Sequence, residues 1–396
     1  MKPLRALSTT RLLILVVAVV ALAAAAGAIA VAASGGGGST PPPKPLATAL
    51  HDSLSGQAPV GVTARIKFTN KLFPSGAITG QVGSALMSGA SGRLWATNDG
   101  RGRLELQSNA GDVQIVWNPN DLSIFDASSN TVYRAKLPAQ KSDATDAAKN
   151  SGAEVPTVAR ISDFLAKVGE HVAVSGAEPS NVGGQEAYTV RVSPKHDGGL
   201  LGAAELAWDA SRAVPLRIGI YAQGASSPVL ELAATEISYG HVAASDVEVA
   251  PPASASVVDL GALDKQAHGA GSAPRVHASG LPAVQRAVDF TVVAPDNLVG
   301  LPRQDVRVVG SADSQAALAV YGHGLGAIVV VERKADATAG GGVMGSLPEI
   351  SLDGVTAHEL STQLGTALTW KRGGTAFVLA GSLPSAAAEA AARALK

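Results

Sequence analysis

The sequence predicts an α+β fold: a large, curved antiparallel sheet with helices packed on one face, followed by a second, smaller α+β domain. Two observations carry this prediction. Residues 61–137 alternate apolar and polar side chains with almost no helical periodicity, and turn-forming residues divide the stretch into short runs. Alternation at period 2 places apolar side chains on one face of a sheet and polar ones on the other. We therefore expect an antiparallel sheet with one covered face.

The run GVTARIKF, residues 61–68, shows the alternation most clearly, because every second residue from Val62 to Phe68 is apolar. Later runs place further large apolar side chains on one face in the same way, namely Leu104, Leu106, Ile115 and Trp117. The turns between the runs are rich in Asn, Asp and Gly, as at residues 98–100 and 109–111.

Two segments have helical periodicity instead. Residues 45–54 carry Leu46, Leu50 and Leu54 at positions i, i+4 and i+8. Residues 157–171 carry a wider apolar stripe, formed by Val158, Ile161, Phe164, Leu165 and Val168. Strands resume between residues 188 and 239. The order helix, strands, helix, strands indicates an α+β unit with helices on one face of its sheet.

The first 44 residues predict a membrane tether. Residues 1–11 form a basic tail, residues 12–33 carry no charge, and residues 34–44 form a Gly- and Pro-rich linker. About 20 apolar residues cross a bilayer as a helix, and a basic flank stays in the cytoplasm. The length favours an uncleaved single-pass anchor, and a signal peptide cleaved near Ala30-Val31-Ala32 is the alternative. The rest of the chain is expected outside the cytoplasm, at the cell membrane or, after cleavage, secreted.

The remaining chain is predicted to form two domains. Residues 45–252 form the first, residues 253–275 form a linker rich in small residues and Pro, and residues 276–396 form the second. We expect short strands in the second domain at residues 288–293, 306–309, 316–321, 327–332, 355–359, 366–370 and 375–381. An Ala-rich helix closes the chain, with Ser382 or Ser385 as its N-cap.

Composition excludes several functions. The 396 residues have a formal net charge of −1, so no basic field is present to bind nucleic acid. The absence of Cys excludes disulfides, thiolate catalysis and Cys-ligated metals. The eight His show no metal-ligand spacing, and no nucleophile, base and acid form a set, so neither a cofactor, a metal site nor an enzymatic activity is predicted. The glycine pattern at residues 322–327 precedes a β-type run, which predicts a hairpin instead of a dinucleotide site.

Residues 45 to about 252 resemble the LolA/LolB-like superfamily of envelope lipoprotein carriers, with its RseB-type and lipid-binding relatives. The resemblance rests on the opening helix PLATALHDSL, the strand GVTARIKF, the run GRLELQSNAGDVQIVWNPNDLSIFDASSNTVYRAKL and the segment ELAWDASRAVPLRIGIYAQG. It implies a half-open barrel whose apolar cavity accepts acyl chains or a lipidated partner. The lipobox Cys of several such proteins is absent, which favours anchoring through residues 12–33. Residues 285–396 resemble a small C-terminal domain often attached to such proteins, and the two-domain arrangement resembles that of RseB-type regulators.

The candidate site is the apolar sheet face together with the helical stripe expected to cover it. The predicted cavity lining is Ile66, Phe68, Leu104, Leu106, Ile115, Trp117, Ile161, Phe164, Leu165 and Trp208. The residues alone favour a filled core on this face, whereas the resemblance favours a cavity for apolar ligands. We therefore predict a membrane-tethered carrier or chaperone that holds the acyl chains of a lipid or lipoprotein. The alternative is an RseB-like envelope-stress sensor that regulates an anti-sigma factor or another membrane protein.

Overall fold

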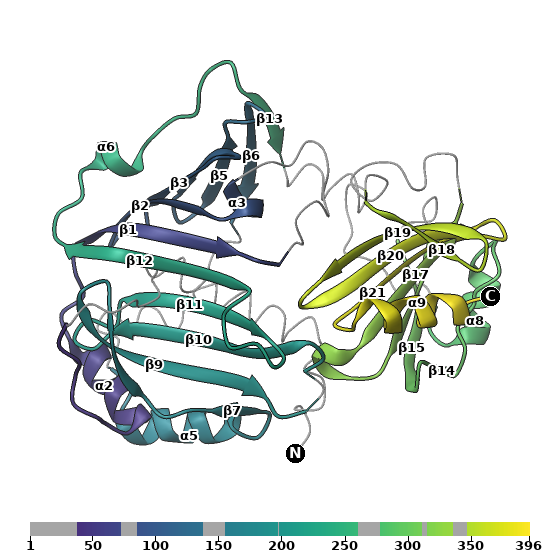
Figure 1. Ribbon diagram of the computed structural model, residues 1–396, viewed down its shortest axis with the longest axis horizontal. Helices are drawn as coiled ribbons and strands as arrows, with labels where there is room; N and C mark the ends of the chain where they lie inside the picture. Colours follow the sequence, from purple (N-terminus) through teal and green to yellow (C-terminus); the bar gives the residue numbers. More distant parts are fainter. Residues whose placement is uncertain are drawn as a thin grey trace.

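A computed structural model describes residues 38–72, 85–137, 155–196, 198–259, 278–310, 315–335 and 347–396. The predicted membrane segment, residues 12–33, lies outside the described residues. Within the described ranges, no helix is long and apolar enough to cross a bilayer. This part of the chain is mostly β with few helices, and its strands form two sheets (Figure 1).

The first sheet has 13 strands and curls into an antiparallel half-barrel (Figure 1). In chain order, the strands are β1 (Gly61–Asn70), β2 (Ala90–Thr97), β3 (Gly102–Ser108), β4 (Gly111–Trp117), β5 (Asp121–Asp126), β6 (Thr131–Lys136), β7 (Val172–Val174), β8 (Glu178–Val182), β9 (Gln185–Pro194), β10 (Leu201–Asp209), β11 (Pro215–Ala222), β12 (Leu230–Tyr239) and β13 (Ser256–Asp259). Their spatial order is β13-β6-β5-β4-β3-β2-β1-β12-β11-β10-β9-β7, and β8 pairs with β9. Two meanders, β1 to β6 and β9 to β12, therefore meet where β1 pairs with β12.

The predicted alternation is visible in the burial of β1. Val62, Ala64 and Ile66 are buried, whereas Arg65 and Lys67 are exposed. Strand β13 lies inside the predicted linker and is the one member of this sheet described as pairing in parallel, with β6. The first sheet therefore includes residues 256–259, which lie beyond the predicted end of the first domain at residue 252.

Helices contact the first sheet at separate places. Helices α2 (Leu46–Ser55) and α5 (Val158–Val168) pack against each other beside β7, β9 and β10, as Figure 1 shows. Thr157 caps α5, because its side chain accepts a hydrogen bond from the Arg160 N–H. The short helix α3 (Ala85–Ser88) lies on β1, β3 and β4, and α6 (Ala244–Val247) lies beside β2 and β3.

The second sheet has eight strands, β14 (Asn297–Leu298), β15 (Leu301–Val309), β16 (Ala316–Tyr321), β17 (Ile328–Lys334), β18 (Glu349–Leu352), β19 (Val355–Thr362), β20 (Gly365–Arg372) and β21 (Thr375–Gly381). Helices α8 (Leu281–Ala287) and α9 (Ser385–Ala394) pack on it and close its core. The glycine pattern at residues 322–327 connects β16 to β17, with a single turn η1 (Gly324–Gly326), so the predicted hairpin is confirmed.

Two local predictions for the second domain are wrong. Residues 288–293 do not form a strand, because side chains take their N–H groups: Gln285 binds the Val292 N–H, and Glu332 binds the Val293 N–H. Neither predicted serine caps α9. The N-cap position is Pro384, Ser382 bonds backbone outside the helix, and Ser385 bonds Glu359.

Candidate functional site

The register of the first sheet defines one continuous apolar line across six strands. Cross-strand partners lie on the same face of a sheet. Successive partners on β9, β10, β11, β12, β1 and β2 are Val190, Leu206, Ile218, Leu232, Phe68 and Ala90, which we term the apolar row. All six are half-buried, not buried. A second line of partners on the same face is formed by Val192, Ala204, Ile220 and Leu230.

The apolar row connects two hydrophobic clusters that helices cover. At one end, Phe68, Ala90 and Leu232 pack against the cluster of β1 to β4 beneath α3. At the other end, Val190 and Leu206 pack against Tyr188, Trp208 and α2. Within the described residues, Ile218 at the centre belongs to neither cluster. In the described residues, the two clusters therefore cover the ends of the apolar row and leave Ile218 at its centre outside them.

The opposite face of the same strands carries a charged network. Glu205 Oε1 accepts a hydrogen bond from Arg191 at 2.7 Å, and Oε2 accepts one from the Tyr221 hydroxyl at 2.7 Å and lies 3.1 Å from Arg217. Arg217 also donates to Glu231 at 2.8 Å. Ionic and apolar side chains thus segregate to opposite faces, which leaves the apolar face without charge along the apolar row.

This pairing shifts two pKa values. Burial alone would raise the pKa of Glu205, yet the hydrogen bonds from Tyr221 and Arg191 and the charge of Arg217 hold it below its usual value. Burial, together with the hydrogen bond to Glu205, raises the pKa of Tyr221 to about 12. Glu205 is therefore ionised and Tyr221 neutral at neutral pH, so the Tyr221 hydroxyl keeps the proton that it donates to the Glu205 carboxylate.

Six of the ten predicted lining residues come together in one place. Ile66, Leu104 and Leu106 are buried, and half-buried Phe68, Ile115 and Trp117 pack against them. The cluster is completed by Ala64, Ala85, Leu94, Val113 and Ala234. Most of these side chains pack against one another, and Phe68 is the predicted residue that also belongs to the apolar row.

The predicted helical stripe does not face these six residues. Helix α5 packs against α2 near β7 and β9, at the far end of the sheet from α3. Ile161 is buried, Leu165 is half-buried, and Phe164 is 63% exposed. Trp208 lies in the α2 cluster. The expected contact is wrong because the chain enters α5 after β6 and returns to the opposite edge of a wide sheet.

The structure also reveals side chains that the sequence prediction omitted. Ile218, Ile220, Leu230 and Leu232 lie in strands that the periodicity does indicate. Their nearness to Phe68 depends on the pairing of β12 with β1, which joins residues at least 160 positions apart. Alternation places each side chain on a face, but it does not order the strands.

Across the described ranges, no three His, Asp or Glu side chains are grouped so that they could hold a metal ion. The described residues thus form a mostly β, curled half-barrel that presents an uncharged apolar row on one face and a charged network on the other.

The chain was compared with known proteins. No family model matches it, and no curated protein matches it. Among solved structures, MucB in complex with MucA(peri) is 13% identical, with 88% of this chain and 96% of that chain covered and a TM-score of 0.41. MucB alone is 15% identical over 87% of this chain and 93% of its own, with a TM-score of 0.35.

A third match is a domain assigned as an outer membrane lipoprotein-sorting protein from Vibrio parahaemolyticus. It is 10% identical, covers 48% of this chain and 89% of its own, and has a TM-score of 0.20. All three matches are at most 15% identical to this chain and have TM-scores of 0.41 or less. Similarity at this level does not indicate what the chain binds.

Proposed function

We propose that the chain is an extracytoplasmic, membrane-tethered protein that holds the acyl chains of a lipid or lipoprotein along the apolar row. The observation that supports this most is a line of apolar side chains, continuous across six strands, that remains half-buried. Side chains in a filled core pack to crystal-like density and lose contact with solvent. Within the described residues, Ile218 at the centre of the row is half-buried and lies outside the two buried clusters at the ends of the row.

The dimensions of the row suit an acyl chain. Six strands at the usual spacing of about 4.8 Å give a row roughly 24 Å long. One leaflet of a bilayer has a hydrocarbon thickness of about 15 Å, half of the usual 30 Å. A whole acyl chain therefore fits along the row, and each CH₂ group removed from water contributes about 0.8 kcal/mol. No catalytic step is needed for this function.

In this proposal, the N-terminal tether holds the protein at the membrane. Residues 12–33 anchor the chain, and residues 34–44 separate the anchor from α2, which begins at Leu46. The C-terminal part of this linker lies against the first sheet, because the Ser39 carbonyl accepts from Asn181 Nδ2 at 2.9 Å and the Pro42 carbonyl accepts from the Tyr188 hydroxyl at 2.7 Å. The half-barrel would then reach lipids or lipoproteins at the membrane to which the chain is attached.

Native mass spectrometry of the full-length chain, followed by organic extraction, tests the function. We expect a stoichiometric acyl lipid that is lost on denaturation. Ile218→Gln should reduce lipid occupancy, whereas the matched variant Val60→Gln should not, because Val60 is 59% exposed and lies outside the row. A lipid-free mass for the wild type, with no uptake of added lipid, would contradict the proposal.

A second candidate is a sensor that regulates a membrane partner. Contacts between the two sheets favour it: the Leu200 N–H donates to Ser382 Oγ at 2.9 Å, and Gln363 Nε2 donates to the Lys71 carbonyl at 3.0 Å. Lys71 follows β1, so a ligand on the first sheet can act on the second. Pull-down of a single-pass membrane protein that depends on added lipid would distinguish a sensor from a carrier.

A further inference from the structure

The chain before α2 is held against one edge of the first sheet. At this edge, β7 and β8 pair with one side of β9, whose other side pairs with β10. Asn181 of β8 and Tyr188 of β9 donate hydrogen bonds to carbonyls of the linker, and Lys44 forms a backbone bridge with the chain between β7 and β8. Residues 39–44 therefore lie on the sheet, and residues 34–38 alone connect them to the proposed anchor.

This short connection limits the distance between the first sheet and the bilayer. The proposed anchor, residues 12–33, would form a helix of about 33 Å, close to the hydrocarbon thickness of about 30 Å, so Ala33 would lie near the surface of the hydrocarbon. The six residue steps from Ala33 to Ser39 span at most about 22 Å, even when fully extended. The headgroup layer takes up roughly 6 Å of this distance. The edge formed by β7, β8 and β9 would therefore lie within about 16 Å of the headgroups.

Helix α5 lies at the same edge, because it leads directly into β7 (Figure 1). Ile161 is the one buried residue of α5. Phe164 is 63% exposed, which is the highest value for a large hydrophobic side chain in the described residues. An aromatic side chain of this size is therefore in water at the part of the sheet that the connection holds near the bilayer.

Two cations flank this aromatic side chain. Arg160 and Lys167 lie four residues before and three residues after Phe164, so the three side chains share one surface of the helix. Both cations are exposed, and within the described ranges neither side chain forms an ion pair. Asp163, the one acidic residue of α5, points about 100° away from Phe164 around the helix axis. This surface of α5 is thus aromatic and positively charged.

Such a surface suits the boundary between water and lipid. Aromatic side chains are enriched at the headgroup level of membranes, and helices that lie in this layer combine Phe or Leu with Lys or Arg. Each cation near an anionic leaflet contributes about as much as a factor of five to ten in binding. The short connection and the composition of α5 are independent observations, and both point to the bilayer surface as the partner.

We propose that α5 docks on the membrane surface, with Phe164 at the headgroup level and Arg160 and Lys167 on the phosphates of anionic lipids. The inference rests on the proposed function, since it takes the anchor at residues 12–33 from there. It adds an orientation of the half-barrel on the membrane. The β9 end of the apolar row, at Val190, lies nearest the bilayer, and the row leads away from the bilayer towards β2.

The test measures the depth of single labelled positions. The chain contains no Cys, so an introduced cysteine is the one site for a thiol-reactive fluorophore. Full-length Phe164→Cys and Val257→Cys are labelled in vesicles of phosphatidylcholine and phosphatidylglycerol that contain a lipid with a nitroxide quencher on its headgroup. Val257 is the matched control, because it is 56% exposed and lies on β13, at the opposite end of the curled sheet from α5 (Figure 1).

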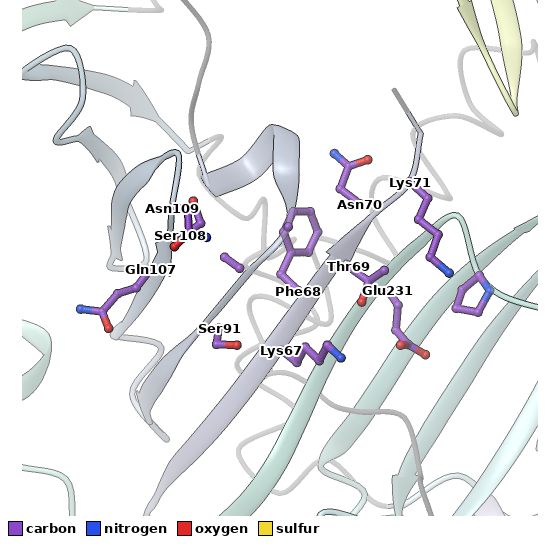
Figure 2. A pocket seen from close by; sticks show the side chains of 13 residues that line it. Lys67, Phe68, Thr69, Asn70, Lys71, Ser91, Gln107, Ser108, Asn109 and Glu231 are labelled. Atoms are coloured by element: carbon purple, nitrogen blue, oxygen red, sulfur yellow. The ribbon is translucent and has the colours of Figure 1, made fainter. Parts of the chain in front are cut away.

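A second set of variants separates the contribution of α5 from that of the short connection. An insertion of about ten Gly and Ser residues after Gly36 raises the reach of the connection to about 58 Å. In this background, Arg160→Gln/Lys167→Gln removes the two cations of α5. Lys67→Gln/Lys71→Gln is the control of equal charge change. Figure 2 shows these two exposed lysines at a polar pocket where β1 ends, and β12, β11 and β10 separate β1 from β9.

We expect the headgroup nitroxide to quench the label at residue 164 and not the label at residue 257, with the native or the lengthened connection. With the lengthened connection, the ratio of docked to undocked protein should fall by roughly 30-fold in Arg160→Gln/Lys167→Gln, the effect of two cations at an anionic surface. The control variant should keep the wild-type ratio. An equal loss in both variants would overturn the role of the α5 cations.

The remaining outcomes distinguish this inference from the proposed function. A label at residue 164 that stays unquenched, in protein that still floats with the vesicles in a density gradient, would overturn docking by α5 and leave the anchor and the acyl site intact. Protein that does not float with the vesicles would overturn the anchor itself. Protection of residue 164 in protein-containing native membranes alone would overturn the lipid surface as the partner. The lipid occupancy of Ile218→Gln tests the acyl site independently of all these results.

Discussion

Leu232 of β12 lies directly opposite Phe68 of β1, and this pair joins the two halves of the first sheet. On one side of the pair, β1 to β6 form a meander on which α3 packs, and on the other side β9 to β12 form a meander whose strands β9 and β10 pack against α2. Both side chains are half-buried and belong to the apolar row. The proposed acyl site therefore exists only once residues far apart in sequence have paired.

Filling the centre of the row should abolish acyl binding without unfolding the protein. Ile218→Trp adds a large apolar side chain where Ile218 is half-buried, so it occupies space that the lipid needs. We expect lipid affinity to fall by at least about tenfold, equivalent to 1.4 kcal/mol, with an unchanged or higher Tm. Val257→Trp, at a site 56% exposed on β13, is the control. Undiminished lipid occupancy in Ile218→Trp would place the acyl chain elsewhere.

Much of the local structure follows from residue patterns. Period-2 alternation predicts β1, β3 and β4, and helical stripes predict α2 and α5 at nearly their observed bounds. Each of these signals is local, since it depends on which side chains must leave water within about ten residues. The burial of Ile66, Leu104 and Leu106 in one cluster follows from the same reasoning, because a meander pairs neighbours in sequence.

The remaining errors concern pairing over long distances. Helix α5 covers the β7–β9 end of the sheet, and the sequence contains no local signal for which end a crossing segment will reach. Residues 288–293 alternate apolar and polar side chains over most of their length, but Gln285 and Glu332 bind the N–H groups of residues 292 and 293. Side-chain competition for backbone donors is a tertiary effect and leaves no periodic pattern.

Ser53→Ala should destabilise the first sheet. Ser53 is 1% exposed; its Oγ accepts from Trp208 Nε1 at 3.0 Å and lies 2.7 Å from the Ala49 carbonyl oxygen. Removing the hydroxyl leaves the buried indole N–H without a partner, which costs about 1–3 kcal/mol. Urea unfolding measures the loss. Ser55→Ala, in the exposed last turn of the same helix, should change stability by less than about 0.5 kcal/mol. Equal effects of the two variants would contradict this account.

Ser382→Ala should loosen the contact between the two sheets. Ser382 Oγ donates to the Leu364 carbonyl at 2.7 Å and accepts from the Leu200 N–H at 2.9 Å, so one hydroxyl binds both sheets. Its loss should cost about 1–2 kcal/mol of coupling and separate the thermal transitions of the two sheets in calorimetry. Ser385→Ala removes a bond to Glu359 inside the second sheet, and should lower that sheet's Tm without separating the transitions. A single, unchanged transition in Ser382→Ala would contradict the prediction.

Glu332 should make the second sheet less stable as pH rises towards neutrality. Its side chain is 1% exposed, Oε2 accepts from the Val293 N–H at 2.8 Å, and within the described residues Oε1 has no hydrogen-bond partner. Burial raises the pKa of Glu332 from its ordinary 4.5 to about 7, against a smaller opposing effect of the Val293 hydrogen bond.

The direction of this pH dependence follows from the number of protons that the folded and unfolded states hold. Between about pH 4.5 and 7 the folded state holds a proton on Glu332 that the unfolded state has released, so the free energy of unfolding falls as pH rises. The full loss is on the order of 3 kcal/mol, since each pKa unit corresponds to about 1.4 kcal/mol. Glu332→Gln keeps an acceptor for the Val293 N–H and cannot ionise. Calorimetry at pH 5 and pH 8 should therefore show a larger Tm decrease for the wild type than for Glu332→Gln, and parallel decreases would show that Glu332 does not titrate in this range.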